Sequence, residues 1–152
     1  MRANMHFVRG FRKPVLLFAV LVLALCVPAG AAAAGQLVYD EADLLTAEQE
    51  AALTAKAAEL GAKRETDFII ITLNGTGGKD IVDYVADFYD EKAPGYNGPH
   101  GNAAILAIDL EQRDVFLAGF KLAEIRLDDA RLDKIRTKIT PDLSAGRFYD
   151  AF

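Results

Sequence analysis

The chain has 152 residues, of which 22 are acidic and 17 are basic, and this length leaves room for one ordinary domain. Four bases and no acids precede Gly35, so the rest of the chain holds 22 acids and 13 bases, a net charge of −9. Such an acidic surface repels phosphate backbones, which argues against nucleic acid as a partner. Cysteine is absent after Cys26, so no disulfide is expected, and roughly 118 residues are enough to fold around a core alone.

Residues 1–34 have the composition of a secretory signal. Arg2, Arg9, Arg12 and Lys13 supply a basic start, residues 15–27 are all apolar, and small residues follow through Ala31–Ala34. This order of basic, apolar and small-residue regions predicts export, with cleavage between Ala31 and Gly35. An uncleaved signal anchor is the alternative, although the apolar run is shorter than the ~20 residues that span a bilayer. A lipoprotein is disfavoured because Leu25, a large residue, precedes Cys26.

Strands and helices alternate in the first half of the predicted domain. Residues 36–39 are a short strand candidate, and Thr46-Ala47-Glu48-Gln49 has the form of a capping box that opens a helix reaching about Gly61. Residues 68–73 are almost continuously apolar and β-branched, which is typical of a central strand buried on both faces. The glycine-rich segment 74–78 breaks this strand, and a helix with one apolar stripe is expected from about Lys79 to Glu91.

The second half begins with a loop over residues 94–101, which contains three glycines and two prolines. Residues 103–110 predict a second buried strand, and residues 114–118 predict its antiparallel partner. Asp128 is the expected N-cap of a further helix that Pro141 should end. Residues 142–152 begin another apparent helix without a terminal cap, so the chain is expected to be a C-terminally incomplete piece of a longer protein.

This order of elements predicts an α/β fold. Strands buried on both faces require helices on both sides of the sheet, so the expectation is a three-layer α/β/α sandwich around a central mixed sheet of about four strands. The domain is expected to span residues 35–152, after the signal at residues 1–34.

Familiar catalytic motifs are absent from the sequence after the signal. His100 is its one histidine, and no zinc-ligand spacing, Walker loop or Gly-x-Ser-x-Gly elbow occurs. The segment 74–78 lies between a strand and a helix, where phosphates are often bound, but it matches no nucleotide fingerprint and reads better as a plain turn. No organic cofactor is therefore expected.

Polar residues near the predicted loops are the candidates for a site. Asp40, Glu41 and Asp43 place three carboxylates just before the first helix, where they could bind a hard cation such as calcium or simply stabilise the helix N-terminus. Asp109 ends a buried strand, where a carboxylate needs a partner unless it faces solvent at the turn. His100 and Asn102 lie in or beside the long loop, and an exposed loop histidine remains the simpler reading of His100.

The stretch Val38-Tyr39-Asp40-Glu41-Ala42-Asp43-Leu44-Leu45-Thr46 resembles the opening motif of the TPM domain family. The later segments, through the Pro141 region, follow in the order typical of that family, so the resemblance covers Leu37 to Phe152. It implies an α/β/α sandwich on the far side of a membrane, often followed by a membrane helix. It also implies calcium-like ion binding in some members and a claimed phosphatase activity in a few.

The metal ligands that this resemblance suggests are Asp40, Asp43 and Asn102, with Asp109 added from its place on the strand. The family commonly has Asp-Asn-Gly before its central strand, whereas this chain has Gly101-Asn102-Ala103 and so lacks one carboxylate. The leading hypothesis is an extracytoplasmic accessory domain, secreted or tethered to the outer face of the plasma membrane. It would assist a membrane protein or membrane-bound complex and bind calcium or another divalent cation. The alternative is a metal-dependent acid phosphatase.

The sequence also nominates a position for the site. Open α/β sheets bind ligands in the crevice beyond the strand ends. The predicted ligand site therefore lies where the segment 40–43 meets the loop 94–102, with weak calcium affinity.

Overall fold

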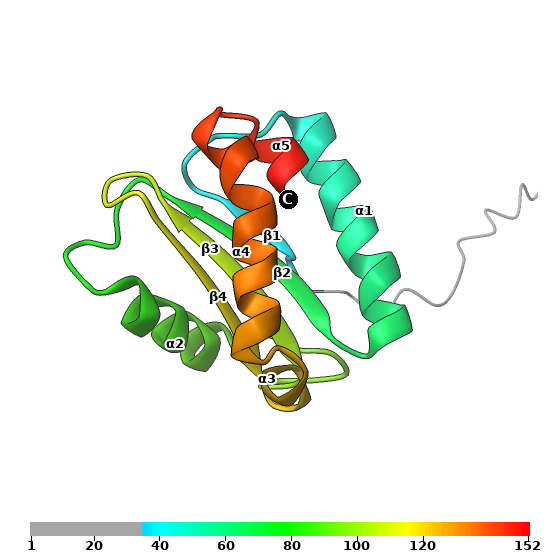
Figure 1. The fold of residues 1–152 in the computed structure, drawn as a ribbon. Coiled ribbons are helices and arrows are strands. Elements are labelled where there is room, and N and C mark those ends of the chain that lie inside the picture. The colour runs from blue at the N-terminus through cyan, green and yellow to red at the C-terminus, as the bar shows by residue number, and fades with distance from the viewer. Residues whose placement is uncertain (1–34) are drawn as a thin grey trace, which may run out of the picture. The chain divides into compact units, whose positions relative to one another are not determined.

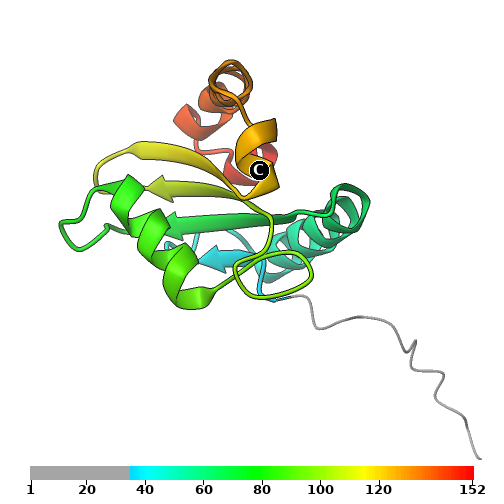
Figure 2. The same cartoon turned by 90° about the horizontal axis from the view of Figure 1, so that it is seen from below.

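A computed structural model describes residues 35–152, and the predicted signal at residues 1–34 lies outside this range. The described residues form a four-stranded sheet with helices on both sides, as Figures 1 and 2 show. This confirms the predicted α/β/α sandwich with a mixed central sheet. No helix in this range is long and apolar enough to cross a membrane.

The strands follow chain order across the sheet. They are β1 (Val38–Asp40), β2 (Asp67–Leu73), β3 (Ala103–Asp109) and β4 (Asp114–Phe120). The first three strands run parallel, and β4 returns antiparallel to β3 through a tight turn. The registers Asp40 to Thr72 and Leu73 to Asp109 bring the carboxyl ends of the three parallel strands to the same edge of the sheet.

Helix α1 (Ala47–Arg64) begins as predicted and ends later. The capping box is present, because the Thr46 side chain accepts from the Gln49 amide and the Gln49 side chain accepts from the Thr46 amide. Gly61 does not end the helix. A Cβ there would lie 3.0 Å from the Thr66 carbonyl oxygen, so this glycine permits the chain to return closely past the helix. The left-handed cap residue is Glu65, with φ of 53°.

Helix α2 (Ile81–Lys92) covers one face of the sheet, and α1 and α4 (Asp129–Ser144) lie over the other (Figures 1 and 2). The apolar stripe of α2 is buried at Ile81, Val85, Phe88 and Tyr89, as its spacing predicts. It packs against alternate residues of the central strands, which are Ile69, Ile71, Leu73, Ala103, Ile105 and Ala107. This face contains most of the core.

The C-terminal part differs from the prediction in two ways. Pro141 does not end the helix, because α4 continues through it to Ser144. Pro141 cannot donate the hydrogen bond that an amide at this position would give to Thr137, and the helix nevertheless continues for three more residues. The short helix α3 (Leu122–Arg126) was not predicted, and α5 (Phe148–Ala151) is a single turn after which Phe152 packs against Val38, Leu45, Leu53 and Ile70.

Candidate functional site at the carboxyl edge of the sheet

Two of the nominated residues lie at the carboxyl edge of the parallel strands. Asp40 ends β1 and Asp109 ends β3, with the end of β2 between them. In open α/β sheets this is the edge at which ligands bind, because loops from neighbouring strands diverge there. Asp43 follows in the turn after β1. The topology therefore brings Asp40, Asp43 and Asp109 to one edge.

Asp40 uses both carboxylate oxygens within the protein. Its Oδ1 accepts a hydrogen bond from the hydroxyl of Thr72, a fully buried residue of β2, and its Oδ2 accepts from the Leu45 amide at 2.8 Å. The Thr72 hydroxyl in turn accepts from the Ala42 amide at 3.2 Å. These bonds fix the turn that leads into α1. Asp40 thus organises the backbone turn before α1, and neither of these bonds goes to an amide of the helix itself.

The other acidic residues of this turn are exposed. Asp43 has a left-handed backbone with φ of 54°, and its amide donates to the Asp40 carbonyl at 3.3 Å. Glu41 lies near Tyr84 of α2: burial raises the pKa of this tyrosine, and the Glu41 carboxylate raises it further. The Tyr84 phenol therefore stays protonated at neutral pH. Neither the Glu41 nor the Asp43 carboxylate forms a hydrogen bond or an ion pair within residues 35–152.

Asp109 is fully buried and only half satisfied. Its Oδ1 accepts from the Glu111 amide at 2.8 Å and from the Gln112 amide at 3.4 Å, which closes the β3–β4 turn. Its Oδ2 is buried without any hydrogen-bond partner among residues 35–152. An unsatisfied buried oxygen of this kind is costly, so it indicates a partner that residues 35–152 do not supply, such as an ordered water or a cation.

A cavity of about 450 Å³ adjoins Asp109. Its polar lining comes from the β3–β4 turn and from α4, and consists of Arg113, Asp114, Arg136, Thr140 and Ser144. Sequence reasoning missed this lining, because exposed arginines and threonines on a helix look like ordinary surface residues. Thr72 could have been found, since it is the one polar residue within the apolar run 68–73.

Asn102 and His100 lie at the opposite edge. Asn102 directly precedes β3, whose seven residues separate it from Asp109 by roughly 20 Å at 3.3 Å per residue. Its side chain donates to the Glu65 carbonyl at 3.0 Å and accepts from the Leu122 amide at 3.1 Å, so it ties α1 to α3. The His100 Nε2 lies 3.1 Å from the Asp90 carbonyl oxygen. Both residues support the loop.

The predicted meeting of segment 40–43 with loop 94–102 is therefore not what the structure shows. The loop follows α2 and enters β3 at its amino end, whereas Asp40 stands where β1 finishes. In a parallel sheet these positions are at opposite edges. Across residues 35–152, no three histidine, cysteine, aspartate or glutamate side chains are grouped so as to hold a metal ion. Among the four nominated ligands, Asp109 alone has a buried oxygen without a partner.

The glycine-rich segment 74–78 has the geometry of a turn. Gly75, Gly77 and Gly78 all have positive φ, and a Cβ on Gly75 would collide with the Glu111 carboxylate. At the start of α2, the Val82 amide already donates to the Asp80 side chain at 2.8 Å. The plain-turn interpretation therefore explains this segment without a bound phosphate.

Comparisons with known proteins agree with this architecture. Residues 38–152 match the family model of the TPM domain. Over 117 residues, 77% of this chain, the sequence is 50% identical to UPF0603 protein YdjH of Bacillus subtilis (strain 168). The match covers 44% of that relative, so the chain spans less than half of its length.

A solved structure supports the fold independently. It is the solution NMR structure of the N-terminal domain of a P. gingivalis protein, with a TM-score of 0.60 and 20% sequence identity. The match covers 78% of this chain and 75% of that one, and at this identity it bears on the fold alone. Together with the family match over the described domain, these findings lead to one conclusion: the chain belongs to the TPM domain family.

Proposed function

We propose that this chain is an extracytoplasmic TPM accessory domain that assists a membrane protein or a membrane-bound complex, and that it binds a divalent cation at the carboxyl edge of its sheet. The composition of residues 1–34 supports export. The family match supports the domain type. Whether the signal is cleaved decides between a secreted protein and one tethered to the outer face of the plasma membrane.

Asp109 is the observation that carries the cation proposal. Its Oδ2 is buried without a partner among residues 35–152, and a cation would supply the missing contact. Calcium accepts carboxylate, carbonyl, hydroxyl and water oxygens together, so one anchoring carboxylate can be completed by neighbouring neutral groups. Asp40 supports the turn in this arrangement, and Asp43 and Asn102 lie outside the first coordination sphere.

Calorimetry with calcium chloride tests the cation site. A site with one anchoring charge should bind with a Kd of about 10⁻⁴–10⁻³ M. At ten times the Kd, calcium should raise the free energy of unfolding by about 1.4 kcal/mol. Asp109→Asn should abolish both signals, whereas Glu91→Gln removes one charge from an exposed position on α2 and should leave them unchanged. Binding that survives in Asp109→Asn would contradict the site.

The cellular location of the protein and the identity of its partner have to be tested with the full chain in cells. Mass spectrometry of exported protein should find a new N-terminus between Ala31 and Gly35, and an intact segment 1–27 would indicate an anchor instead. Photo-crosslinking from exposed positions on the intact chain should then capture a defined membrane protein. Crosslinks that form only with soluble cytoplasmic proteins would contradict the accessory role.

One observation favours the alternative, a metal-dependent acid phosphatase. The cavity beside Asp109 is also lined by Arg113 and Arg136, and phosphoryl transfer needs such positioned cations. Under the accessory proposal, a generic phosphomonoester at acidic pH should show little turnover. Substantial turnover that is lost in both Asp109→Asn and Arg136→Gln, but kept in Glu91→Gln, would replace the accessory proposal with the enzymatic one.

A further inference from the structure

An apolar groove crosses the sheet face that lies between α1 and α4. Its volume is about 220 Å³, and its floor includes Phe68, Ala104, Leu106 and Leu117, all of them only partly buried. The groove exists because α4 packs loosely: of its 16 residues, only Ile139 is buried. Apolar sheet residues are normally covered by a closely packed helix, so this strip of the sheet is left without a partner inside the described domain.

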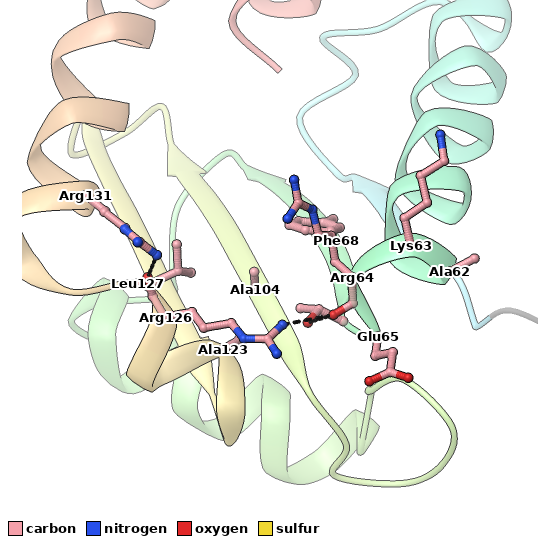
Figure 3. Close-up of a pocket in the computed structure, with 11 residues that line it drawn as sticks. Ala62, Lys63, Arg64, Glu65, Phe68, Ala104, Ala123, Arg126, Leu127 and Arg131 are labelled. Carbon is pink, nitrogen blue, oxygen red and sulfur yellow. Dashed lines mark hydrogen bonds between the residues drawn. The ribbon is translucent and has the colours of Figure 1, made fainter.

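The groove opens into a basic cavity at the amino edge of the sheet. This cavity has a volume of about 590 Å³ and shares Phe68, Ala104 and Leu127 with the groove. Three arginines line it: Arg64 from the end of α1, Arg126 from α3, and Arg131 from α4 (Figure 3). We call these three residues the arginine mouth. The domain has a net charge of −9, so a cluster of three arginines without acidic partners stands out from the rest of its surface.

Backbone carbonyls hold two of these side chains in place. Arg126 Nη1 donates to the Arg64 carbonyl at 3.2 Å, and Arg131 Nη1 donates to the Arg126 carbonyl at 2.6 Å. Each contact uses one of the five N–H groups of a guanidinium, so most donors stay available. The Arg64 side chain makes no hydrogen bond within residues 35–152, and none of the three arginines forms an ion pair there.

Nearby charges do not neutralise the mouth. Glu65 is the one acidic residue of the lining, and its side chain points away from the Arg126 guanidinium in Figure 3. Lys63 also points away and pairs with Glu59 at 2.5 Å. The Asp128 side chain accepts from the Arg131 amide at 2.9 Å as the N-cap of α4. Within residues 35–152, neither Glu65 nor Asp128 forms an ion pair with Arg64, Arg126 or Arg131.

We propose that the groove and the arginine mouth bind a single-chain anionic lipid, with the acyl chain along the groove and a phosphate or carboxylate head group at the arginines. Guanidinium groups match both anions in geometry and charge. The groove lining is apolar apart from Lys56, which suits an acyl chain, and the arginines beside it match an anionic head group. This site is at the opposite edge from Asp109 and stands independently of the cation proposal.

Calorimetry with n-alkyl phosphates below their micelle concentrations tests the proposal on the purified domain. Decyl phosphate should bind more tightly than octyl phosphate by up to about 15-fold, because each buried methylene strengthens binding up to about fourfold. Inorganic phosphate should bind far more weakly than either. Decyl maltoside, which has the tail without the charge, should bind at least tenfold more weakly than decyl phosphate.

Matched variants distinguish the contribution of the phosphate head group to binding from that of the alkyl chain. Arg64→Gln and Arg131→Gln should each weaken decyl phosphate binding several-fold, and Lys138→Gln, which removes an exposed charge from α4 outside the mouth, should not. Leu106→Trp should block the groove and weaken decyl phosphate while leaving inorganic phosphate unchanged. Should this variant fail to fold, magnetisation transfer in NMR between the decyl methylenes and the Leu106 methyl groups of the wild type provides the same information.

Several outcomes would overturn the proposal. Equal affinity for inorganic phosphate and decyl phosphate would indicate a free-anion site. Equal losses in Lys138→Gln and Arg64→Gln would indicate unspecific charge attraction. Binding to phosphatidylglycerol vesicles that Leu106→Trp leaves unchanged would indicate a bilayer-surface contact. If no alkyl phosphate binds and the mouth variants instead lose the crosslinked membrane protein, the groove serves a protein partner.

Discussion

The two faces of the sheet differ in how closely their helices pack against them. The face under α2 is closed by one helix of 12 residues, whose aromatic and aliphatic stripe is fully used. The face under α1 and α4 carries 34 helical residues (18 and 16) and still leaves a groove. The difference is one of packing: the α2 face is closed, and the other face has a smaller buried cluster beside a partly exposed apolar groove.

The largest expected effect tests this difference directly. Ile71 is completely buried on the α2 face, and Ile71→Ala should lower the free energy of unfolding by about 2–5 kcal/mol. Leu106→Ala on the groove face should cost about 1 kcal/mol or less, because the side chain is already partly in contact with water. Urea unfolding of both variants is the measurement. Equal losses would mean that the two faces are packed equally well.

A substitution at Gly119 tests how closely α3, which carries Arg126 of the arginine mouth, must pack against β4. It lies on β4 beneath α3, and a Cβ there would stand 2.6 Å from the backbone of Ala123 and Glu124. Gly119→Ala should therefore push α3 away and cost about 1–3 kcal/mol. Thermal unfolding should show the loss, while Gly35→Ala, where nothing lies within 4 Å, should change little. An unchanged melting temperature would show that α3 adjusts freely.

Tyr89 offers a smaller change on the packed face. Its hydroxyl donates to the Gly101 carbonyl at 2.8 Å, and its ring stacks on Phe120 at a centroid distance of 3.9 Å. Burial raises the pKa of Tyr89, so the hydroxyl remains a donor at neutral pH. Tyr89→Phe keeps the stack and should lower the free energy of unfolding by about 0.5–1.5 kcal/mol. Tyr149→Phe, at an exposed tyrosine, is the matched control.

Asp67 should give the smallest effect, and its sign depends on pH. Desolvation at the start of β2 raises the pKa of Asp67, although a hydrogen bond from the Gly95 backbone partly offsets this. Because the folded pKa exceeds the unfolded value, this carboxylate destabilises the protein above its folded pKa, and the penalty disappears as pH falls below the unfolded value of 3.8. Asp67→Asn should therefore be slightly stabilising at pH 7 and neutral near pH 3 in urea titrations. Stabilisation that is the same at both pH values would contradict this origin.

The fold was largely predictable because its central strands are unusual in composition. Residues 68–73 and 103–109 are nearly continuous apolar runs, and such runs between amphipathic helices allow few architectures. Helix α3 was missed because five residues are too few to show a helical period. Pro141 misled because the loss of one backbone hydrogen bond disfavours a helix without forbidding it, and α4 continues to Ser144.

The candidate site was predictable only in part. Asp109 stood out because a carboxylate at the end of an apolar strand has to be explained, and the structure leaves one of its oxygens without a partner in the described domain. Asn102 lies apart from Asp40 because its loop enters β3 at the amino edge of the sheet, and loop composition does not reveal the edge at which a loop enters. The arginine mouth could not be predicted, since Arg64, Arg126 and Arg131 come together only through the packing of three helices.

The short first strand has a consequence for the order of folding. Tyr39 of β1 pairs with Ile71, 32 residues later, whereas β3 and β4 meet across a tight turn. Closing the longer loop costs more chain entropy, so the β3–β4 hairpin should form early and β1 should join the sheet late. A chain synthesised from its N-terminus must then carry β1 unpaired until β2 is complete.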